Sequence, residues 1–278
     1  MPQNYQKRGY LHEPFRLFHL RDVGVEEMEY HYHEFHKVVL FLGGAASYLI
    51  EGRSYLLQPG DVLLVGRRQI HKPVIDPTRP YERIVLYLDP EFLSAGETDL
   101  SLCFRRAEER HFSLMRPTGG DRAALERLSA GLERALSDGE FGGALLAKTW
   151  LWQLMIFLNR LQERDRTSQD AGAIRFDPKI TQVLDYINAN LAADLSVERL
   201  AGLAYTSRYH FMRRFREQTG YSVHQYVTEK RLLAADALLR DGLPAQEVGL
   251  RCGFQDYSTF HRAFKRQFGI TPKEARGS

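Results

Sequence analysis

The sequence is poor in cysteine and lacks any long apolar stretch. Its two cysteines, Cys103 and Cys252, lie far apart in the 278 residues, so neither a disulfide framework nor a paired-cysteine zinc site is expected. No apolar run approaches the roughly 20 residues that span a bilayer. The polar residues 1–10 lack the apolar core of a signal peptide. We therefore predict a cytoplasmic protein with no membrane partner.

Charge is close to balanced overall but is distributed unevenly. Residues 179–278 contain 15 Lys and Arg against 10 Asp and Glu, whereas residues 1–178 contain 23 against 25. Taken alone, an excess of this size indicates solvated surface. It points to a nucleic-acid partner only if the charges fall on one face of a motif.

The first hundred residues have the pattern of a β domain. Four short segments are rich in β-branched or aromatic residues and are bounded by turn signals, namely residues 38–42, 46–50, 62–65 and 83–88. Closely spaced short strands of this kind predict an antiparallel barrel or sandwich.

Helical periodicity replaces the β pattern after Gly120. Leucines recur at helical spacing from Leu125 to Leu136, and residues 144–161 form a wide apolar face. These helices either only cover the β domain or also pair two subunits, and the sequence leaves both interpretations open. The polar stretch 163–177, with charges of both signs, has the composition of a linker.

From residue 179 onward the sequence predicts only helices. They span residues 179–191, 197–204, 208–219, 223–240, 245–252 and 257–268. The N-cap candidates are Ser196, Ser207 and Asp256, and the C-terminal stops are Gly220, Gly242 and Gly269.

This helical region contains an internal repeat. Residues 207–216 align with residues 256–265 at an offset of 49, so that the cap, both phenylalanines, one arginine and the final basic residue coincide. Upstream, residues 200–201 align with 248–249 at an offset of 48, which places one extra residue in the second turn. Each copy is a short helix, a tight turn and a longer capped helix, which is the helix-turn-helix plan.

Each longer helix has two distinct faces. The phenylalanines share one side and are predicted core anchors. The opposite face carries Tyr209, Met212, Arg213 and Arg216 in the first copy and Ser258, His261, Arg262 and Lys265 in the second. Such a face is either solvated or enters a DNA major groove, where arginine can pair with guanine. Because this face recurs at the same place in both copies, the DNA-binding interpretation is favoured over a solvated face.

Between residues 179 and 276 the chain resembles the DNA-binding domain of the AraC/XylS family of bacterial transcription regulators. The similar stretches are LSVERLAGLA, FMRRFREQTGYS, YVTEKRLLAADALL and EVGLRCGFQDYSTFHRAFKRQFGITP. In that family the second helix of each unit reads bases. The resemblance therefore assigns base contacts to Tyr209, Met212, Arg213, Tyr257, Ser258 and Arg262. Phosphate contacts are predicted for Arg216, Lys265 and Lys273.

Two positions depart from the family pattern. Met212 stands where many relatives have a polar residue, so its contact would be apolar, for example with a thymine methyl group. Gly249 replaces the usual alanine in the short helix of the second copy and should weaken that helix by about 1 kcal/mol. We therefore expect two unequal units, with the first supplying more of the affinity.

The front of the chain carries a second pattern. The sequence HYHEFHK at residues 31–37, the turns at 43–44 and 59–61, and His71 resemble the cupin-type sensor barrel at the front of many AraC-type regulators. A metal-dependent cupin enzyme has a glutamate close after the second histidine, where this chain has Lys37 and Val38. Because a lysine opposes a metal cation, the pattern is open to three interpretations: a metal site, a ligand pocket or structural histidines.

The ligand-pocket interpretation assigns effector contacts to His31, His33, Lys37 and His71 as hydrogen-bond donors, with Tyr48 and Arg83 added to the lining. The predicted effector is a small polar molecule, either a sugar or a carboxylate. Its binding would change the arrangement of two DNA-binding domains.

The complete prediction is an α+β protein with two domains. Residues 1–116 form a cupin-like antiparallel β-barrel with an N-terminal arm, residues 117–163 a helical dimerisation segment, residues 164–178 a linker, and residues 179–278 an all-α domain with helix-turn-helix units at about 196–219 and 244–268. The predicted partners are double-stranded DNA, a small effector, a second copy of the chain and, from the resemblance, RNA polymerase, as for an activator. No cofactor, metal or catalytic residue is predicted. The alternative is a metal-dependent cupin enzyme with an accessory helical domain.

Overall fold

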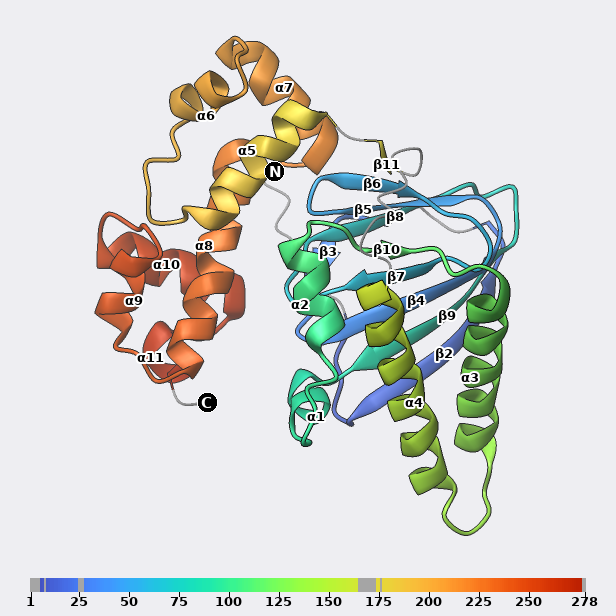
Figure 1. Ribbon diagram of the computed structural model, residues 1–278. Helices are drawn as coiled ribbons and strands as arrows, with labels where there is room; N and C mark the ends of the chain where they lie inside the picture. Colours follow the sequence, from blue (N-terminus) through green and yellow to red (C-terminus); the bar gives the residue numbers. More distant parts are fainter. Residues whose placement is uncertain (1–5, 8, 25–27, 165–173, 176, 277–278) are drawn as a thin grey trace. The chain divides into compact units, whose positions relative to one another are not determined.

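The computed structural model describes residues 6–7, 9–24, 28–164, 174–175 and 177–276. The chain divides into two compact units, the first made of Lys7–Ile50 and Ser54–Arg175 and the second mainly of Phe176–Ser278. Figure 1 shows that the first unit combines β-sheets with helices and that the second is helical. Most of the predicted linker and much of the predicted N-terminal arm lie outside the described residues.

The first unit contains two β-sheets whose described strand pairs are antiparallel. The six-stranded sheet has the order β1 (Gln6–Lys7), β3 (His31–Tyr32), β8 (His71–Ile75), β5 (Ala46–Ile50), β6 (Arg53–Leu56) and β11 (Ile174–Arg175). The five-stranded sheet has the order β10 (Leu114–Met115), β7 (Val62–Val65), β4 (His36–Gly43), β9 (Tyr81–Leu88) and β2 (Phe15–Asp22).

Strand β4 is buried on both faces. Val38 and Leu40 point to one side, into a core shared with the helices of this unit. Val39 and Phe41 point to the other side, into a core shared with Tyr48 of β5. Because successive side chains alternate across a strand, this double burial explains the continuous apolar run of the strand.

Helices cover the outer face of the five-stranded sheet (Figure 1). They are α1 (Pro90–Ser94), α2 (Leu102–Glu109), α3 (Gly119–Ser137) and α4 (Gly143–Arg164). The residues of α4 that face the sheet core are Ala147, Leu151, Leu154, Met155, Leu158 and Leu161. Within the described chain, no helix combines the length and the apolar character needed to cross a bilayer.

The predicted antiparallel β domain is confirmed, and its described strands form two separate sheets that are not closed into one barrel. All four predicted strands are present, but the other described strands, among them β2 and β8, were not predicted. Closure depends on pairing between strands that are distant in sequence. The strand pattern does not contain that information. One such pairing, between β3 and β8, consists of the single partner pair His31 and His71.

The second unit consists of seven helices in its described part. They are α5 (Pro178–Ala189), α6 (Val197–Leu203), α7 (Arg208–Thr219), α8 (Val223–Arg240), α9 (Ala245–Arg251), α10 (Tyr257–Phe268) and α11 (Pro272–Ala275). Six of them agree with the predicted helices to within two residues. The four-residue α11 was not predicted, although Thr271 and Glu274 form a capping box at its start.

The caps and anchors of the two longer recognition helices agree with the sequence pattern. Ser207 and Asp256 each accept a hydrogen bond from the backbone N–H three residues later, and Gly220 and Gly269 adopt left-handed conformations at the helix ends. Both phenylalanine pairs are fully buried, with ring centroids 5.6 Å apart in each copy. Ser196 differs, because its hydroxyl donates to Asp194 and makes no cap bond.

The turns of the two helix-turn-helix copies share a left-handed backbone conformation but have different residues there. Tyr205 and Gly253 follow the short helices α6 and α9, and both have positive φ, at 51° and 85°. A tyrosine in this region is strained because its Cβ crowds the backbone. A Cβ on Gly253 would lie 2.4 Å from the carbonyl oxygen of Leu191. The glycine is therefore required in the second turn, whereas the tyrosine is tolerated in the first.

We expect Tyr205→Gly to raise the free energy of unfolding by up to about 1 kcal/mol, because it removes left-handed strain from an exposed residue. Gly253→Ala should lower it by more than about 1 kcal/mol, because strain and overlap with Leu191 add together. Urea denaturation of the full chain, followed by circular dichroism, measures both changes. A loss of stability in Tyr205→Gly would show that the side chain makes contacts that outweigh the strain.

Candidate DNA interface and effector cavity

Eight of the nine predicted DNA-contact side chains lie on the exposed surfaces of α7 and α10, and the ninth, Lys273, is exposed on α11. In α7 they are Tyr209, Met212, Arg213 and Arg216, and in α10 they are Tyr257, Ser258, Arg262 and Lys265. Tyr209 is 76% exposed and Met212 is 37% exposed. Large side chains left in solvent on a capped, otherwise polar helix face are suited to contact with a partner.

The contacts of the two equivalent arginines within the described chain are weak and lie at the surface. In Arg213, Nη2 lies 3.4 Å from His210 Nδ1 and Nε lies 3.9 Å from the Glu217 carboxylate. In Arg262, Nε donates to the backbone oxygen of Ser258 at 3.3 Å. Exposed contacts of this kind contribute little to stability, so either guanidinium can turn towards a base at small cost.

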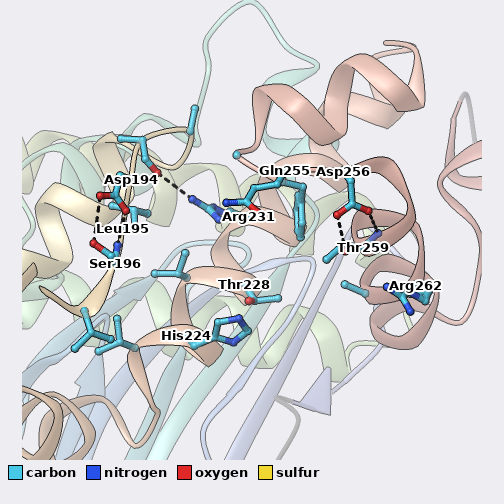
Figure 2. Close-up of a pocket in the computed structure, with 18 of the residues that line it drawn as sticks. Asp194, Leu195, Ser196, His224, Thr228, Arg231, Gln255, Asp256, Thr259 and Arg262 are labelled. Atoms are coloured by element: carbon cyan, nitrogen blue, oxygen red, sulfur yellow. Dashed lines mark hydrogen bonds between the residues drawn. The ribbon is translucent and has the colours of Figure 1, made fainter. Parts of the chain in front are cut away.

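A groove of about 1030 Å³ lies within the second unit, between the loop before α6, the first half of α8 and one side of α10 (Figure 2). Arg262 and Arg266 supply exposed cations to its wall, and His224 and Thr228 line it from α8. Arg231 donates to the backbone oxygens of residues 191 and 193 at 2.9 and 3.1 Å. This arginine ties the loop to α8 and is therefore committed to the structure of the groove.

The carboxylates of the groove are engaged locally. Asp194 accepts from the backbone N–H of Ser196 at 2.9 Å, and Asp256 accepts from the backbone N–H of Thr259 at 2.7 Å. Among the described residues, neither Arg262 nor Arg266 forms an ion pair with Asp194 or Asp256. Arg266, His224 and Thr228 were absent from the sequence prediction. For Arg266 there was a signal, since it lies four residues after Arg262 and therefore on the same side of the helix.

The two helix-turn-helix copies differ in the turn, where the offset of the sequence repeat changes from 48 to 49 residues. The turn takes residues 204–207 in the first unit and residues 252–256 in the second. A Cβ on Gly249 would lie 3.0 Å from Cδ1 of the buried Phe260. The glycine that departs from the family pattern therefore has a packing reason, because alanine would press on an anchor ring.

A second candidate site is a cavity of about 170 Å³ between the strands of the first unit. Of the predicted effector-contact residues, His31, His33, Lys37, Tyr48 and Arg83 line it. His71 lies directly behind, with its ring centroid 4.3 Å from that of His31 and 4.8 Å from that of His33. The fold therefore brings all six predicted residues together, from β3, β4, β5, β8, β9 and the segment between β3 and β4.

The histidines are oriented by their own backbone surroundings. Nδ1 of His31, His33 and His71 lies 2.9, 2.7 and 2.9 Å from the carbonyl oxygens of Glu29, Phe35 and Gln69. A carbonyl oxygen can only accept, so each Nδ1 carries the proton and donates it. Burial, followed by the nearby Lys37 ammonium, holds the pKa of His33 and of His71 well below the usual range. In these two neutral rings Nε2 is consequently an acceptor, whereas the sequence prediction made them donors.

The Nε2 atoms of His33 and His71 are buried and have no hydrogen-bond partner among the described residues. Buried acceptors without donors are uncommon in folded proteins and call for an explanation. Among the residues that the structure describes, no group of three His, Cys, Asp or Glu side chains is arranged to hold a metal ion.

Lys37 is the buried cation of this cavity, at 7% exposure. Its Nζ donates to the Tyr48 hydroxyl at 3.3 Å, and burial lowers the pKa of Lys37 to about 8. The other cation of the lining, Arg83, is already paired, because its Nη1 lies 2.5 Å from the Asp22 carboxylate.

Further lining residues of the cavity follow from strand alternation. Tyr81, Val85 and Tyr87 lie on the same side of β9 as Arg83 and also line the cavity. The sequence prediction named Arg83 alone, although a period of two along that strand contained the signal for the others. Within the described residues, the lining contains no acidic side chain.

Comparisons with known proteins cover nearly the whole chain. The transcriptional activator RhaS of Enterobacter sp. (strain 638) is 25% identical over 88% of this chain and 86% of RhaS. The transcriptional regulator LumQ of Photobacterium leiognathi is 27% identical over 87% of this chain and 90% of LumQ. A crystal structure of the AdpA DNA-binding domain in complex with a target DNA is 35% identical, covers 36% of this chain and 91% of that domain, and superposes with a TM-score of 0.35.

Two family models match the two units separately. The AraC-like ligand-binding domain matches residues 22–155, and a helix-turn-helix domain matches residues 200–278. The first match contains the cavity with its buried histidines, and the second contains both recognition helices. These matches favour a regulator over the cupin-enzyme alternative. The chain belongs to the AraC family of transcription regulators, with a ligand-binding domain followed by a DNA-binding domain.

Proposed function

We propose that this regulator reads a two-part DNA site through α7 and α10. The observation that carries this proposal is the repeated exposed face on two capped helices, each anchored by a buried phenylalanine pair. Base contacts are assigned to Tyr209, Met212, Arg213, Tyr257, Ser258 and Arg262. Two major-groove segments about one helical turn apart would accept the two helices.

Phosphate contacts are assigned to Arg216 and Lys265, which lie towards the ends of the same two helices. Arg266 and His224 of the groove are added to this set, because the DNA backbone between two occupied major-groove segments needs a basic surface. The carboxylates of the groove are engaged in local hydrogen bonds. Contacts of this kind strengthen binding to any sequence and make it depend on salt.

The cavity of the first unit is the proposed effector site. His31, His33, Lys37, His71, Tyr48 and Arg83 surround a small, polar and buried space, which suits a small polar effector. For the effector to regulate DNA binding, it must have different affinities for the two arrangements of the DNA-binding units.

A second copy of the chain is the proposed partner of α4. Leu145, Trp152 and Ile156 are 63%, 38% and 38% exposed. Their spacings of seven and four residues place them in one stripe along the helix, away from the buried residues that face the sheet. An exposed apolar stripe with heptad-like spacing on a long helix is more favourable in contact with a second copy than in solvent.

Further parts of the proposal rest on the family. We expect the protein to act in the cytoplasm without catalytic activity of its own. Because the similar protein RhaS is a transcriptional activator, we expect this chain to contact RNA polymerase.

We expect Arg213→Ala and Arg262→Ala each to weaken binding to the specific site by about 1–3 kcal/mol and to relax base preference at one position. The site is first selected from a random DNA pool with the unaltered protein, and binding is measured by fluorescence anisotropy. Arg134→Ala is a matched control, because Arg134 of α3 is exposed and donates to a carbonyl oxygen four residues earlier, as Arg262 does. Unchanged affinity and preference in both test variants would contradict the assignment of base contacts.

Arg216→Ala and Lys265→Ala should weaken binding to specific and random DNA alike. Each should also reduce the slope of log K against log salt concentration by about 1, since one phosphate contact is lost. Titrations at several salt concentrations measure the slope. A loss confined to the selected sequence, with the slope preserved, would reassign these residues to base contact.

Trp152→Glu should convert the dimer to a monomer, because a carboxylate in the centre of an apolar interface loses its hydration. Gln153→Glu changes an exposed neighbour outside the stripe and should leave the dimer intact. Light scattering after gel filtration gives the mass of each. A monomeric unaltered protein, or a dimer that survives Trp152→Glu, would exclude this interface.

A further inference from the structure

The proposed effector cavity, here called the sensor cavity, contains a buried cation, Lys37, that has no acidic partner among the described residues. Lys37 lies on β4 with its side chain on the same side of the sheet as Val39 and Phe41, which belong to the apolar core. Its described polar contact is a single hydrogen bond of 3.3 Å to the neutral Tyr48 hydroxyl. An ammonium group has three donors, and a buried charge is costly without a partner of opposite sign.

No carboxylate of the described residues neutralises Lys37. The cavity lining contains no acidic side chain, and the nearby Asp22 is paired with Arg83. The groups that face Lys37 are Tyr48 from β5, Tyr87 and Arg83 from β9, and the histidines 33 and 71. None of these groups is an acid, so among the described residues nothing supplies the opposite charge, and the carboxylate of a ligand would supply it.

The size and the acceptors of the cavity restrict that ligand. A volume of about 170 Å³ is below the roughly 300–1,000 Å³ of sites for drug-sized molecules. The unpartnered Nε2 lone pairs of His33 and His71 lie close to the same space and would repel a second negative oxygen group. A small molecule with one carboxylate group therefore fits the cavity, and a dicarboxylate does not.

We propose that the effector is a small monocarboxylate whose carboxylate accepts hydrogen bonds from Lys37 Nζ inside the sensor cavity. This inference rests on the proposed role of the cavity as the effector site, and it selects between the sugar and the carboxylate that the sequence left open. Lys37 is then the residue that determines the chemical class of the effector, and the Tyr48 hydroxyl positions its ammonium group.

Acetate is the smallest probe of this chemistry, and acetamide is its neutral isostere. Sodium acetate should raise the Tm of the full chain in a saturable way relative to sodium chloride at equal ionic strength. Acetamide, propane-1,2-diol and succinate should not. Lys37→Met should weaken acetate binding by about tenfold to hundredfold, the loss of one charge-assisted hydrogen bond. Lys72→Met, which changes a lysine of β8 outside the cavity lining, should bind acetate normally.

The unliganded variants provide a readout that a purely structural lysine would not give. Since Lys37→Met removes a buried charge that has no acidic partner among the described residues, its Tm without ligand should equal or exceed that of the unaltered protein. A marked fall in Tm would overturn the proposal.

The pH dependence gives a second readout. The pKa of unliganded Lys37 is lowered to about 8, and a bound carboxylate favours its charged form. Acetate affinity should therefore be nearly constant from pH 6 to about 7.5 and fall by up to about tenfold per unit above pH 8. Affinity that does not fall over this range would overturn the proposal.

Three other outcomes also overturn it: no response to acetate, an equal response to acetamide or the diol, or a Tm rise with zinc chloride that His33→Ala abolishes. DNA binding by the same variants is measured in parallel. If acetate binding fails but Lys37→Met still binds the selected DNA, only the proposed class of effector is wrong and the proposed DNA-reading function stands. An unaltered protein that binds acetate but no specific DNA would instead contradict the proposed DNA-reading function.

Discussion

The burial of β4 on both faces is the constraint on which the sensor unit depends. One face of the strand needs an apolar cover, which α3 and α4 provide, and the other needs a second sheet, which β5 and its neighbours provide. Between the two sheets the packing is interrupted where Lys37 and the histidines replace apolar residues. The proposed effector cavity is therefore the polar end of an interior that is otherwise apolar.

Helix α4 packs on the five-stranded sheet with one side and leaves apolar residues exposed on the opposite side. The helix buries six apolar residues against the sheet, and its opposite side still carries Leu145, Trp152 and Ile156. A helix that is apolar on two sides suits a position between two packed layers. The residue pattern that packs this helix on the sheet therefore also leaves the apolar stripe that we propose as the surface for a second copy.

The DNA-binding unit uses one plan twice and adjusts it locally. Both recognition helices have a side-chain cap, two buried rings and a glycine stop. The differences lie in the turns, where Tyr205 and Gly253 take up the same left-handed backbone, and in the contact of Gly249 with Phe260. These differences leave the anchoring intact. The outward side chains of α7 and α10 also differ in type, which agrees with the two unequal units expected from the sequence.

The amino-acid sequence by itself determined the helices, their caps, the repeat and the outward faces of α7 and α10, because these features depend on contacts within a few residues. It also placed His31, His33, Lys37, Tyr48, His71 and Arg83 in one candidate site. Three features required the tertiary structure: the two open sheets, the groove that includes Arg266, and the protonation of the histidines. Sheet closure and the groove arise from segments distant in sequence. The proton sits on Nδ1 because specific carbonyl oxygens lie within 3 Å of it, a distance that no local pattern fixes. That arrangement makes Nε2 of the buried His33 and His71 an acceptor where the sequence predicted donors, and it leaves Lys37 as the proposed effector contact.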